Sequence, residues 1–235
     1  MSINGKAYIV GIYEHPLRRA ENVSTMQLHA DVAHGALLDA GLTASDVDGF
    51  FCGADAPGIG GMGVAEHIGL RGLRHIDSTE TGGSSYLLHV SHAAQAIAAG
   101  KCDVALVTLA DRPLGGNAGV GLAGIDLRQS IDRAFTTAMP KGAVQGYAMV
   151  AQRHMHEFGT TPEQLAWVRV AASHHAQHNP NAMRREVVTV ADVLGSPMIA
   201  NPLHRLDCCV VSDGGGAVVV ARPEIARSLS RPRVK

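Results

Sequence analysis

Side chains that could take part in chemistry are concentrated in residues 77–86, which read Asp-Ser-Thr-Glu-Thr-Gly-Gly-Ser-Ser-Tyr. Glycines at 82 and 83 permit a positive φ and close backbone approach. The helix expected to follow them leaves its first N–H groups without partners. These N–H groups could hold an oxyanion, a thioester carbonyl or a phosphate. The alternative interpretation is an ordinary turn at Gly82 and Gly83, with Ser84 as a helix cap.

The elements needed to position this turn can be identified in the flanking sequence. A short polar strand or loop leads into the glycines, and a helix of about 14 residues opens at Ser84 and Ser85. Gly100 ends the helix, and an apolar strand follows at residues 103–107. The pattern therefore predicts a strand, a sharp turn, a helix and a second strand.

Composition indicates a soluble globular chain. Of 235 residues, 46% are hydrophobic and 17% are charged, which is enough apolar material for a sizeable core. Twenty basic and 21 acidic side chains give a formal charge of −1, which argues against a nucleic-acid partner or an anionic membrane surface. No apolar leader and no run of about 18 apolar residues occurs, so we expect a cytoplasmic protein that does not span a membrane.

Four cysteines are spaced neither as metal ligands nor as a secreted disulfide framework. We expect them to be reduced and mostly buried in the core. They are Cys52, Cys102, Cys208 and Cys209. The sequence therefore predicts no metal site.

Periodicity and turn residues predict the remaining elements. Strands are expected at residues 7–12 and 47–53 and within 208–221, and helices at 24–40, 64–70, 147–158, 161–176 and from 189. The glycine-rich segment 54–72 lacks the Gly-Lys-Ser/Thr ending of a phosphate loop, so nucleotide binding is not expected. Residues 111–146 are irregular and read as an excursion from the main fold.

The glycine turn resembles the nucleophile elbow of the thiolase superfamily, whose strand carries Val-Glu-x-x-Cys-x-Ser-Gly before a buried helix. Anchoring the comparison on Gly100 and residues 103–107 places Glu80 on the family's glutamate. The same register places Gly83 where the family's reactive cysteine stands. A shift of one residue would place Ser84 there instead.

The second half of the chain extends the resemblance to sterol-carrier-type thiolases, or lipid-transfer-protein-like proteins. The matching motifs occur in the family's order along the chain. They are Tyr147-Ala148, residues 153–161, Asn179-Pro180, residues 198–203, residues 206–209 and residues 212–214. Because the motifs follow the family's order, the resemblance is specific. It covers about residues 6–225.

This resemblance implies an α/β thiolase-fold N-terminal domain, with a mixed, mostly parallel five-stranded sheet, helices on both faces and a helical insertion. We assign residues 1–111 and 208–225 to the core, 112–207 to the insertion and 226–235 to a tail or linker. The family's second half carries the activating histidine, so we expect a chain restricted to this half to be inactive alone.

A glycine cannot form an acyl-enzyme, and Ser84 or Ser85 would need an adjacent base. We interpret His89 and His92, further along the helix, as packed or surface histidines. The resemblance then implies a nucleophile-less aldolase that cleaves a β-hydroxyacyl-CoA by retro-aldol chemistry. The alternatives are an acetyl-CoA acetyltransferase and a non-catalytic structural or lipid-carrier subunit.

The resemblance also implies roles and partners. The N–H groups of Gly83 and Ser84 would form part of an oxyanion hole, and Glu80 would support the turn by hydrogen bonds. A coenzyme A thioester is expected as substrate, with no bound cofactor. A homodimer and a small partner protein with an OB-fold and a zinc ribbon are the expected assemblies.

Overall fold

The computed structural model describes residues 3–53, 56, 59–115 and 143–235. The chain divides into two compact units, Met1–Gly116 with Ser212–Lys235, and Asn117–Val211. Most of the irregular excursion expected at 111–146, including Gly116 and residues 139–142, lies outside the described residues. The same holds for residues 54–55 and 57–58 of the glycine-rich segment.

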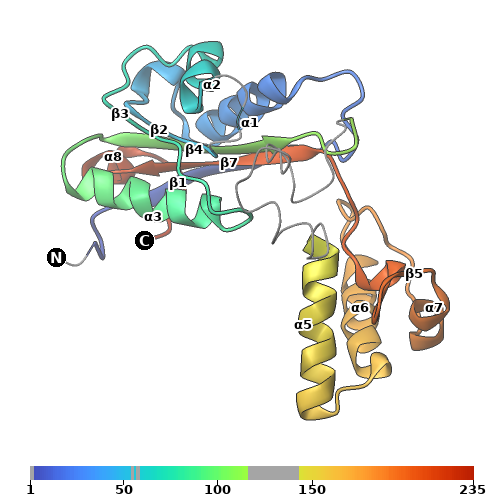
Figure 1. Ribbon diagram of the computed structural model, residues 1–235. Coiled ribbons are helices and arrows are strands. Elements are labelled where there is room, and N and C mark those ends of the chain that lie inside the picture. The colour runs from blue at the N-terminus through green and yellow to red at the C-terminus, as the bar shows by residue number, and fades with distance from the viewer. Residues whose placement is uncertain (1–2, 54–55, 57–58, 116–142) are drawn as a thin grey trace. The chain divides into compact units, whose positions relative to one another are not determined.

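A five-stranded mixed sheet forms the centre of the first unit, with the strand order β1-β7-β4-β2-β3 (Figure 1). Strand β2 pairs in parallel with β3 and β4, whereas β7 is antiparallel to β4 and β1. Four of these strands therefore share one direction, and the expected mixed, mostly parallel sheet is confirmed. The strands are β1 Tyr8–Glu14, β2 Gly49–Phe51, β3 His75–Asp77, β4 Val104–Asp111 and β7 Gly214–Ala221.

Helices cover both faces of this sheet, as expected. On one face lie α1 (Thr25–Ala40) and α2 (Gly61–Ile68), and on the other lies α3 (Ser85–Ala98) (Figure 1). Alternation along the strands supplies both cores: Phe50 packs with the α1 side and Phe51 with the α3 side. In β4, Leu106 and Val107 divide in the same way.

Local sequence explains the ends of α1. The Ser24 hydroxyl accepts a hydrogen bond from the Gln27 N–H at 3.0 Å, which caps the helix. Gly41 ends it with a φ of 74°, in the left-handed region that glycine adopts at low cost. A 3₁₀ turn at Ala44–Asp46 then leads into β2.

Residues 226–235, assigned above to a tail or linker, contact the first unit at two points. Helix α8 (Pro223–Ser228) buries Ala226 completely. Further on, Val234 exchanges two backbone hydrogen bonds with Ile9, at 2.8 and 3.0 Å. The segment therefore packs on the first unit and extends its sheet beyond β1.

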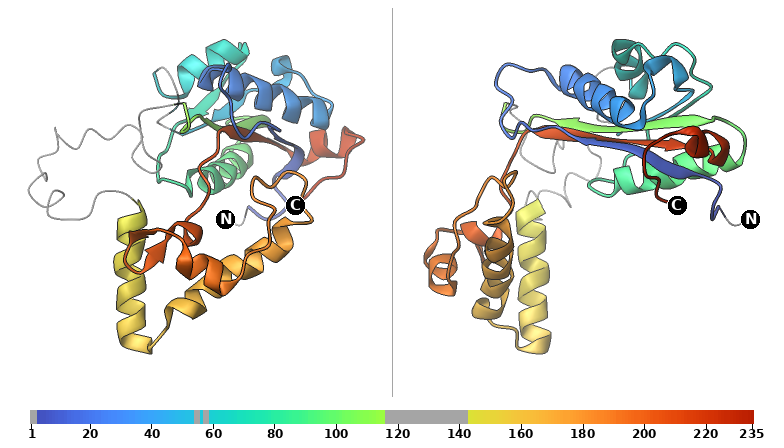
Figure 2. Two further views of the ribbon diagram at one scale, coloured as in Figure 1. Left: turned by 90° about the vertical axis from the view of Figure 1, so that its right-hand side faces the viewer. Right: turned by 180° about the vertical axis from the view of Figure 1, so that it is seen from behind.

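The second unit, shown in two further views in Figure 2, is mainly helical. It contains α5 Ala143–Phe158, α6 Pro162–Ala176, α7 Val190–Gly195, β5 Met198–Ala200, β6 Leu203–His204 and the 3₁₀ turn Arg205–Asp207. Thr161 and Gln164 form a capping box around Pro162, the first residue of α6. Ala166, Val170 and Val193 form its buried cluster.

Two cysteine expectations were wrong. Cys52 and Cys102 are buried, but Cys208 is only partly buried and Cys209 is exposed. The reason is that the strand expected within 208–221 begins only at Gly214, which leaves 208 and 209 outside the sheet. All four cysteines are free thiols.

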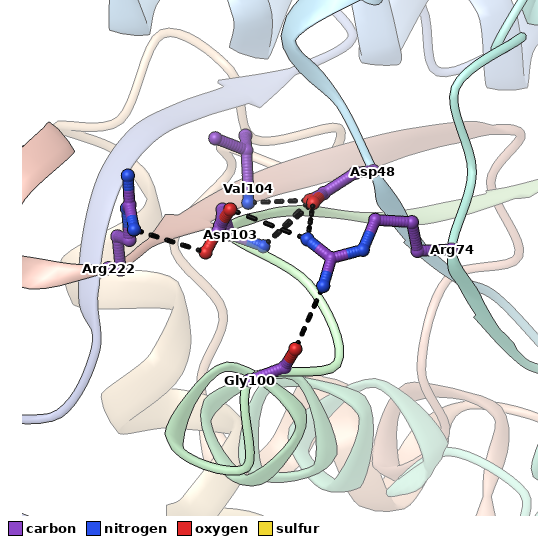
Figure 3. A network of polar contacts seen from close by, with 6 residues as sticks. All are labelled: Asp48, Arg74, Gly100, Asp103, Val104 and Arg222. Atoms are coloured by element: carbon purple, nitrogen blue, oxygen red, sulfur yellow. Dashed lines mark hydrogen bonds and ion pairs between the residues drawn. The ribbon is translucent and has the colours of Figure 1, made fainter.

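A polar network fixes the starts of the central strands (Figure 3). The Asp48 carboxylate accepts hydrogen bonds from the N–H groups of Asp103 and Val104, each at 2.8 Å. Arg74 bonds to Asp48 at 3.1 Å and to the Gly100 carbonyl at 2.9 Å. Residues at the amino ends of β2, β3 and β4 are thus joined to one another.

We expect Asp48→Ala to lower the free energy of unfolding by about 2–4 kcal/mol, because two backbone N–H groups lose a charged acceptor. Arg74→Ala should cost less than about 1 kcal/mol, since an exposed ion pair contributes little. Urea unfolding of both variants measures the difference. Equal losses of unfolding free energy in the two variants would show that the ion pair, and not the backbone hydrogen bonds, holds the strand starts together.

A buried histidine makes the stability of the first unit depend on pH. His29 of α1 is 2% exposed, and its Nδ1 lies 2.9 Å from the Thr108 hydroxyl of β4. Burial lowers the pKa of His29 from 6.5 to about 4. The neutral ring therefore contributes stability above the unfolded-state pKa, and this contribution is lost as the pH falls from 6.5 towards 4.

Over this range His29 alone should give the free energy of unfolding a slope of about 1.4 kcal/mol per pH unit. We expect His29→Gln to remove this part of the slope, as measured by urea unfolding at several pH values. His34→Gln, an exposed position on the same helix, is the control and should keep the slope. A parallel response of the two variants would exclude His29 as the source.

Candidate functional site

The candidate site is the loop between β3 and α3, at the carboxyl end of an edge strand. Gly82 has a φ of 72°, the left-handed conformation that a turn of this kind requires. Its N–H donates a hydrogen bond to Glu80 Oε1. The same oxygen lies 2.9 Å from the Ser85 hydroxyl that donates to it. Glu80 therefore makes the kind of hydrogen bonds to the turn that the sequence analysis expected.

The two serines differ in their surroundings. Ser85 is fully buried, and its Oγ accepts from the Thr81 N–H at 2.8 Å and lies 2.7 Å from the Gly82 carbonyl. Ser84 occupies the N-cap position, but its side chain makes no capping hydrogen bond and its φ of −90° is helical. Ser85 therefore organises the helix start, a role that the sequence analysis gave to Ser84.

Gly83 is the residue that the family resemblance places at the reactive cysteine, with Ser84 as the alternative, and it lies exposed beside this turn. Its φ is not in the positive range, and a Cβ built on it would meet nothing within 4 Å. Sterics therefore do not require glycine at this position. What the position offers to chemistry is backbone only.

Backbone N–H groups are among the polar groups that this site can present to a ligand, beside the exposed side chains of Glu80, Thr81 and Ser84. Gly83 and Ser84 are exposed and immediately precede α3. The first N–H groups of a helix have no partner within the helix, and the helix dipole gives them a partial positive charge. Such a position favours a developing oxyanion, so the expected oxyanion role of Gly83 and Ser84 stays a prediction.

Two histidines interpreted above as packed or surface residues also contact this loop, which was not predicted from the sequence. His89 Nε2 lies 2.8 Å from the Thr79 carbonyl, and His92 Nδ1 lies 2.6 Å from Asp77 Oδ2. His89 is completely buried, as one of the two interpretations held, whereas His92 is only partly covered. Their spacing from Ser85, at i+4 and i+7, was the available signal because it puts all three on one helix face.

Asp77 is held in its charged form. Burial acts to raise its pKa, but hydrogen bonds from the Thr79 hydroxyl, from His92 and from the Thr79 N–H hold the pKa below its usual value. The two Thr79 bonds are 2.6 and 2.9 Å long. The carboxylate therefore joins α3 to the first residues of the loop.

A separate cavity of about 430 Å³ lies within the second unit. Arg169, Leu206, Cys208 and Cys209 are among the residues that line it. Burial, together with the charge of Asp207 and the neighbouring Cys209, raises the pKa of the Cys208 thiol. Cys208 is therefore a poor nucleophile at neutral pH.

Neither a metal site nor a membrane-spanning helix is found in the residues that the structure describes. Among those residues, no group of three or more His, Cys, Asp or Glu side chains is arranged to hold a metal ion. In the same part of the chain, no helix combines the length and the apolar character needed to cross a bilayer.

Comparison with known proteins finds relatives but no matching family model. The chain is 36% identical over 234 residues to the steroid side-chain-cleaving aldolase of Thermomonospora curvata, covering 97% of this chain and 60% of that protein. It is 32% identical to the 17-hydroxy-3-oxo-4-pregnene-20-carboxyl-CoA lyase of Mycobacterium tuberculosis, covering 97% and 61%. An acetyl-CoA acetyltransferase of Methanothermobacter thermautotrophicus is also 32% identical, covering 93% and 57%.

Solved structures give the same result for the fold. The Ltp2-ChsH2(DUF35) aldolase matches with a TM-score of 0.85 at 33% identity, over 97% of this chain and 59% of that one. A monomeric SCP2-thiolase-like protein from Mycobacterium smegmatis matches with a TM-score of 0.74 at 22% identity, over 97% and 48%. The chain spans about three fifths of the length of the relatives named above.

The two turn glycines should respond differently to a methyl group. Gly82→Ala should lower the free energy of unfolding by about 1–2 kcal/mol, because its positive φ strains a residue with a Cβ. Gly83→Ala should change it by less than about 0.5 kcal/mol, since its φ is ordinary and its surroundings are open. Denaturant unfolding compares the pair, and a larger loss at Gly83 would contradict the described turn.

Proposed function

We propose that this chain is part of a thiolase-superfamily protein, and that the whole protein cleaves a β-hydroxyacyl-CoA by a retro-aldol reaction without a covalent intermediate. The observation that carries the proposal is Gly83. The position that the family resemblance assigns to a reactive cysteine bears no side chain, although the turn has room for one. Two relatives with names that describe cleavage, an aldolase and a lyase, support this assignment.

The proposed reaction needs a base and an oxyanion site. A base takes the proton of the β-hydroxyl, the Cα–Cβ bond breaks, and an aldehyde or ketone leaves. The bonding electrons form an enolate of the thioester, which is then protonated at Cα. In this proposal the N–H groups of Gly83 and Ser84 stabilise the enolate oxygen, and one such donor commonly contributes about 10²–10³ in rate. We assign the base to no residue of this chain.

Other candidate nucleophiles in the chain are poorly suited to acyl transfer. Ser85 already makes three short contacts within the turn, and the hydroxyl of exposed Ser84 contacts only the hydroxyl and carbonyl of Thr81 among the described residues, neither of which is a base. Cys102 is buried, and burial with the charges of Asp48 and Asp103 raises its pKa to about 11. A thiolate is needed for attack, so this thiol is inert at neutral pH.

We further propose a coenzyme A thioester with a steroid or other lipid side chain as the substrate, with no bound cofactor. The proposed assembly is a cytoplasmic homodimer joined by a small OB-fold and zinc-ribbon protein. Support for a second component comes from the matched aldolase structure, whose name joins two proteins.

Thiolytic or Claisen acyl transfer is the second candidate. One relative of similar identity is named an acetyl-CoA acetyltransferase, which favours it. A third candidate is a non-catalytic structural or lipid-carrier subunit, which needs no nucleophile at Gly83.

The test incubates the complete protein, with any copurifying partner, with a β-hydroxyacyl-CoA and separately with acetoacetyl-CoA. Retro-aldol cleavage should release an aldehyde or ketone, leave no acyl adduct on the protein, and release no free coenzyme A. Carbonyl product is quantified by derivatisation, free coenzyme A with a thiol reagent, and adducts by intact and peptide mass.

An acyl adduct on the peptide that contains residues 82–86 would replace the proposal with acyl transfer. Peptide mapping is needed because Cys209 is exposed and can react with a thioester non-specifically. Turnover of neither substrate would support the non-catalytic subunit.

A further inference from the structure

One face of α3 holds the loop that carries the candidate site. Ser85, His89 and His92 lie at i, i+4 and i+7, so their side chains share a face of the helix. Each of them contacts the segment from Asp77 to Gly82. The helix thus holds the loop at three points: the beginning of the loop at Asp77, its middle at Thr79 and its end at Gly82.

The middle attachment is a hydrogen bond with a defined direction. A carbonyl oxygen only accepts, so His89 Nε2 carries the proton and donates to Thr79 O across 2.8 Å. The other ring nitrogen, Nδ1, is buried and has no hydrogen-bond partner among the described residues. Tyr86 packs against the ring edge to face, with centroids 5.7 Å apart. A buried ring that leaves one polar nitrogen unpaired is costly, so packing alone would favour an apolar residue here.

The first attachment is the His92–Asp77 pair. Asp77 uses Oδ2 for His92, at 2.6 Å, and Oδ1 for both polar groups of Thr79. Thr79 is therefore held from two sides, through its N–H and hydroxyl by Asp77 and through its carbonyl by His89. Glu80 and the glycine turn follow directly.

We propose that His89 is a positioning residue, assisted by His92, which sets the direction of the Gly83 and Ser84 N–H groups. The inference rests on the proposed function for its effect on turnover. Gly82 and Gly83 are both exposed, and a Cβ at either would meet nothing within 4 Å, so few packed atoms hold the turn. Hydrogen bonds supply the constraint: Glu80 and Ser85 hold Gly82, and His89 and His92 hold the residues that lead into it. Loss of about 1 Å of alignment at a reacting group commonly costs about 10²-fold in rate.

Two substitutions at residue 89 separate the hydrogen bond from the volume of the ring. His89→Gln keeps an amide N–H donor near the position of Nε2, whereas His89→Leu keeps the bulk and removes the donor. At the first attachment, His92→Asn and His92→Leu form the equivalent pair for Nδ1. Gln95→Leu is the matched control, because Gln95 is exposed on the same helix and its side-chain amide donates to the Ser91 hydroxyl, away from the loop.

In the complete protein we expect His89→Leu to lower kcat for carbonyl release by about 10- to 100-fold, with KM changed less than about 3-fold. His89→Gln should retain most of kcat. His92→Leu should show a smaller loss than His89→Leu, since Thr79 keeps its bond to His89. Gln95→Leu should match the unsubstituted protein.

A second readout does not depend on aldolase activity. Gly83→Cys introduces a thiol at the turn, in a Cys209→Ser background that removes the exposed natural thiol. The pH dependence of its alkylation by iodoacetamide reports an apparent pKa, which the nearby helix N–H groups lower. Adding His89→Leu should raise that pKa by roughly half a unit or more, whereas adding His89→Gln or Gln95→Leu should not.

If the complete protein cleaves no β-hydroxyacyl-CoA, the proposed function fails, and the alkylation profile alone decides the role of His89. An unchanged profile in the His89→Leu variant would overturn the positioning role. A lower melting temperature with unchanged kcat and unchanged alkylation would make His89 a residue of stability alone.

Discussion

The hydrogen bonds that the Asp48 carboxylate accepts from Asp103 and Val104 fix the start of β4 against β2, and much of the site depends on this register. Gly49 pairs with Ala105 on one side and with His75 on the other. A slip by one residue would exchange the two faces of each strand, sending Phe50 and Phe51 to the wrong cores. The point at which β3 ends fixes the position of the loop before α3. That point therefore depends on an interaction at the other end of the strands, where β2 and β4 begin.

The family resemblance implied the five-stranded sheet with helices on both faces. Apolar periodicity and helix-boundary residues were sufficient to predict most of the individual strands and helices, including a helix of 14 residues after the glycine turn. These features are local in origin, so a single sequence reveals them. Glu80 bonds to residues no more than five positions away in the sequence, so its hydrogen bonds to the turn could also be predicted. The contacts of His89 and His92 span 10 and 15 residues and depend on how the loop folds back along α3. The exposure of Cys209 was missed because an apolar run was taken for a strand.

Gly83 separates two explanations for the lack of a side chain at the turn. Gly82 needs its positive φ, but Gly83 has an ordinary backbone conformation and open surroundings. Backbone geometry thus explains why residue 82 is glycine. It does not explain residue 83, where the proposed function supplies a reason. A glycine at this point exposes N–H groups without a neighbouring side chain, which suits a site that stabilises charge and forms no bond to the substrate.

The pairing of Val234 with Ile9 affects the association behaviour of the sheet. A β-strand at the edge of a sheet offers unpaired backbone groups to other chains and promotes aggregation. Here the chain's own C-terminal segment occupies part of that edge on β1, through two hydrogen bonds. Removing the residues around Val234 would uncover this edge. A segment assigned from the sequence to a tail or linker therefore also limits edge-to-edge association of the sheet.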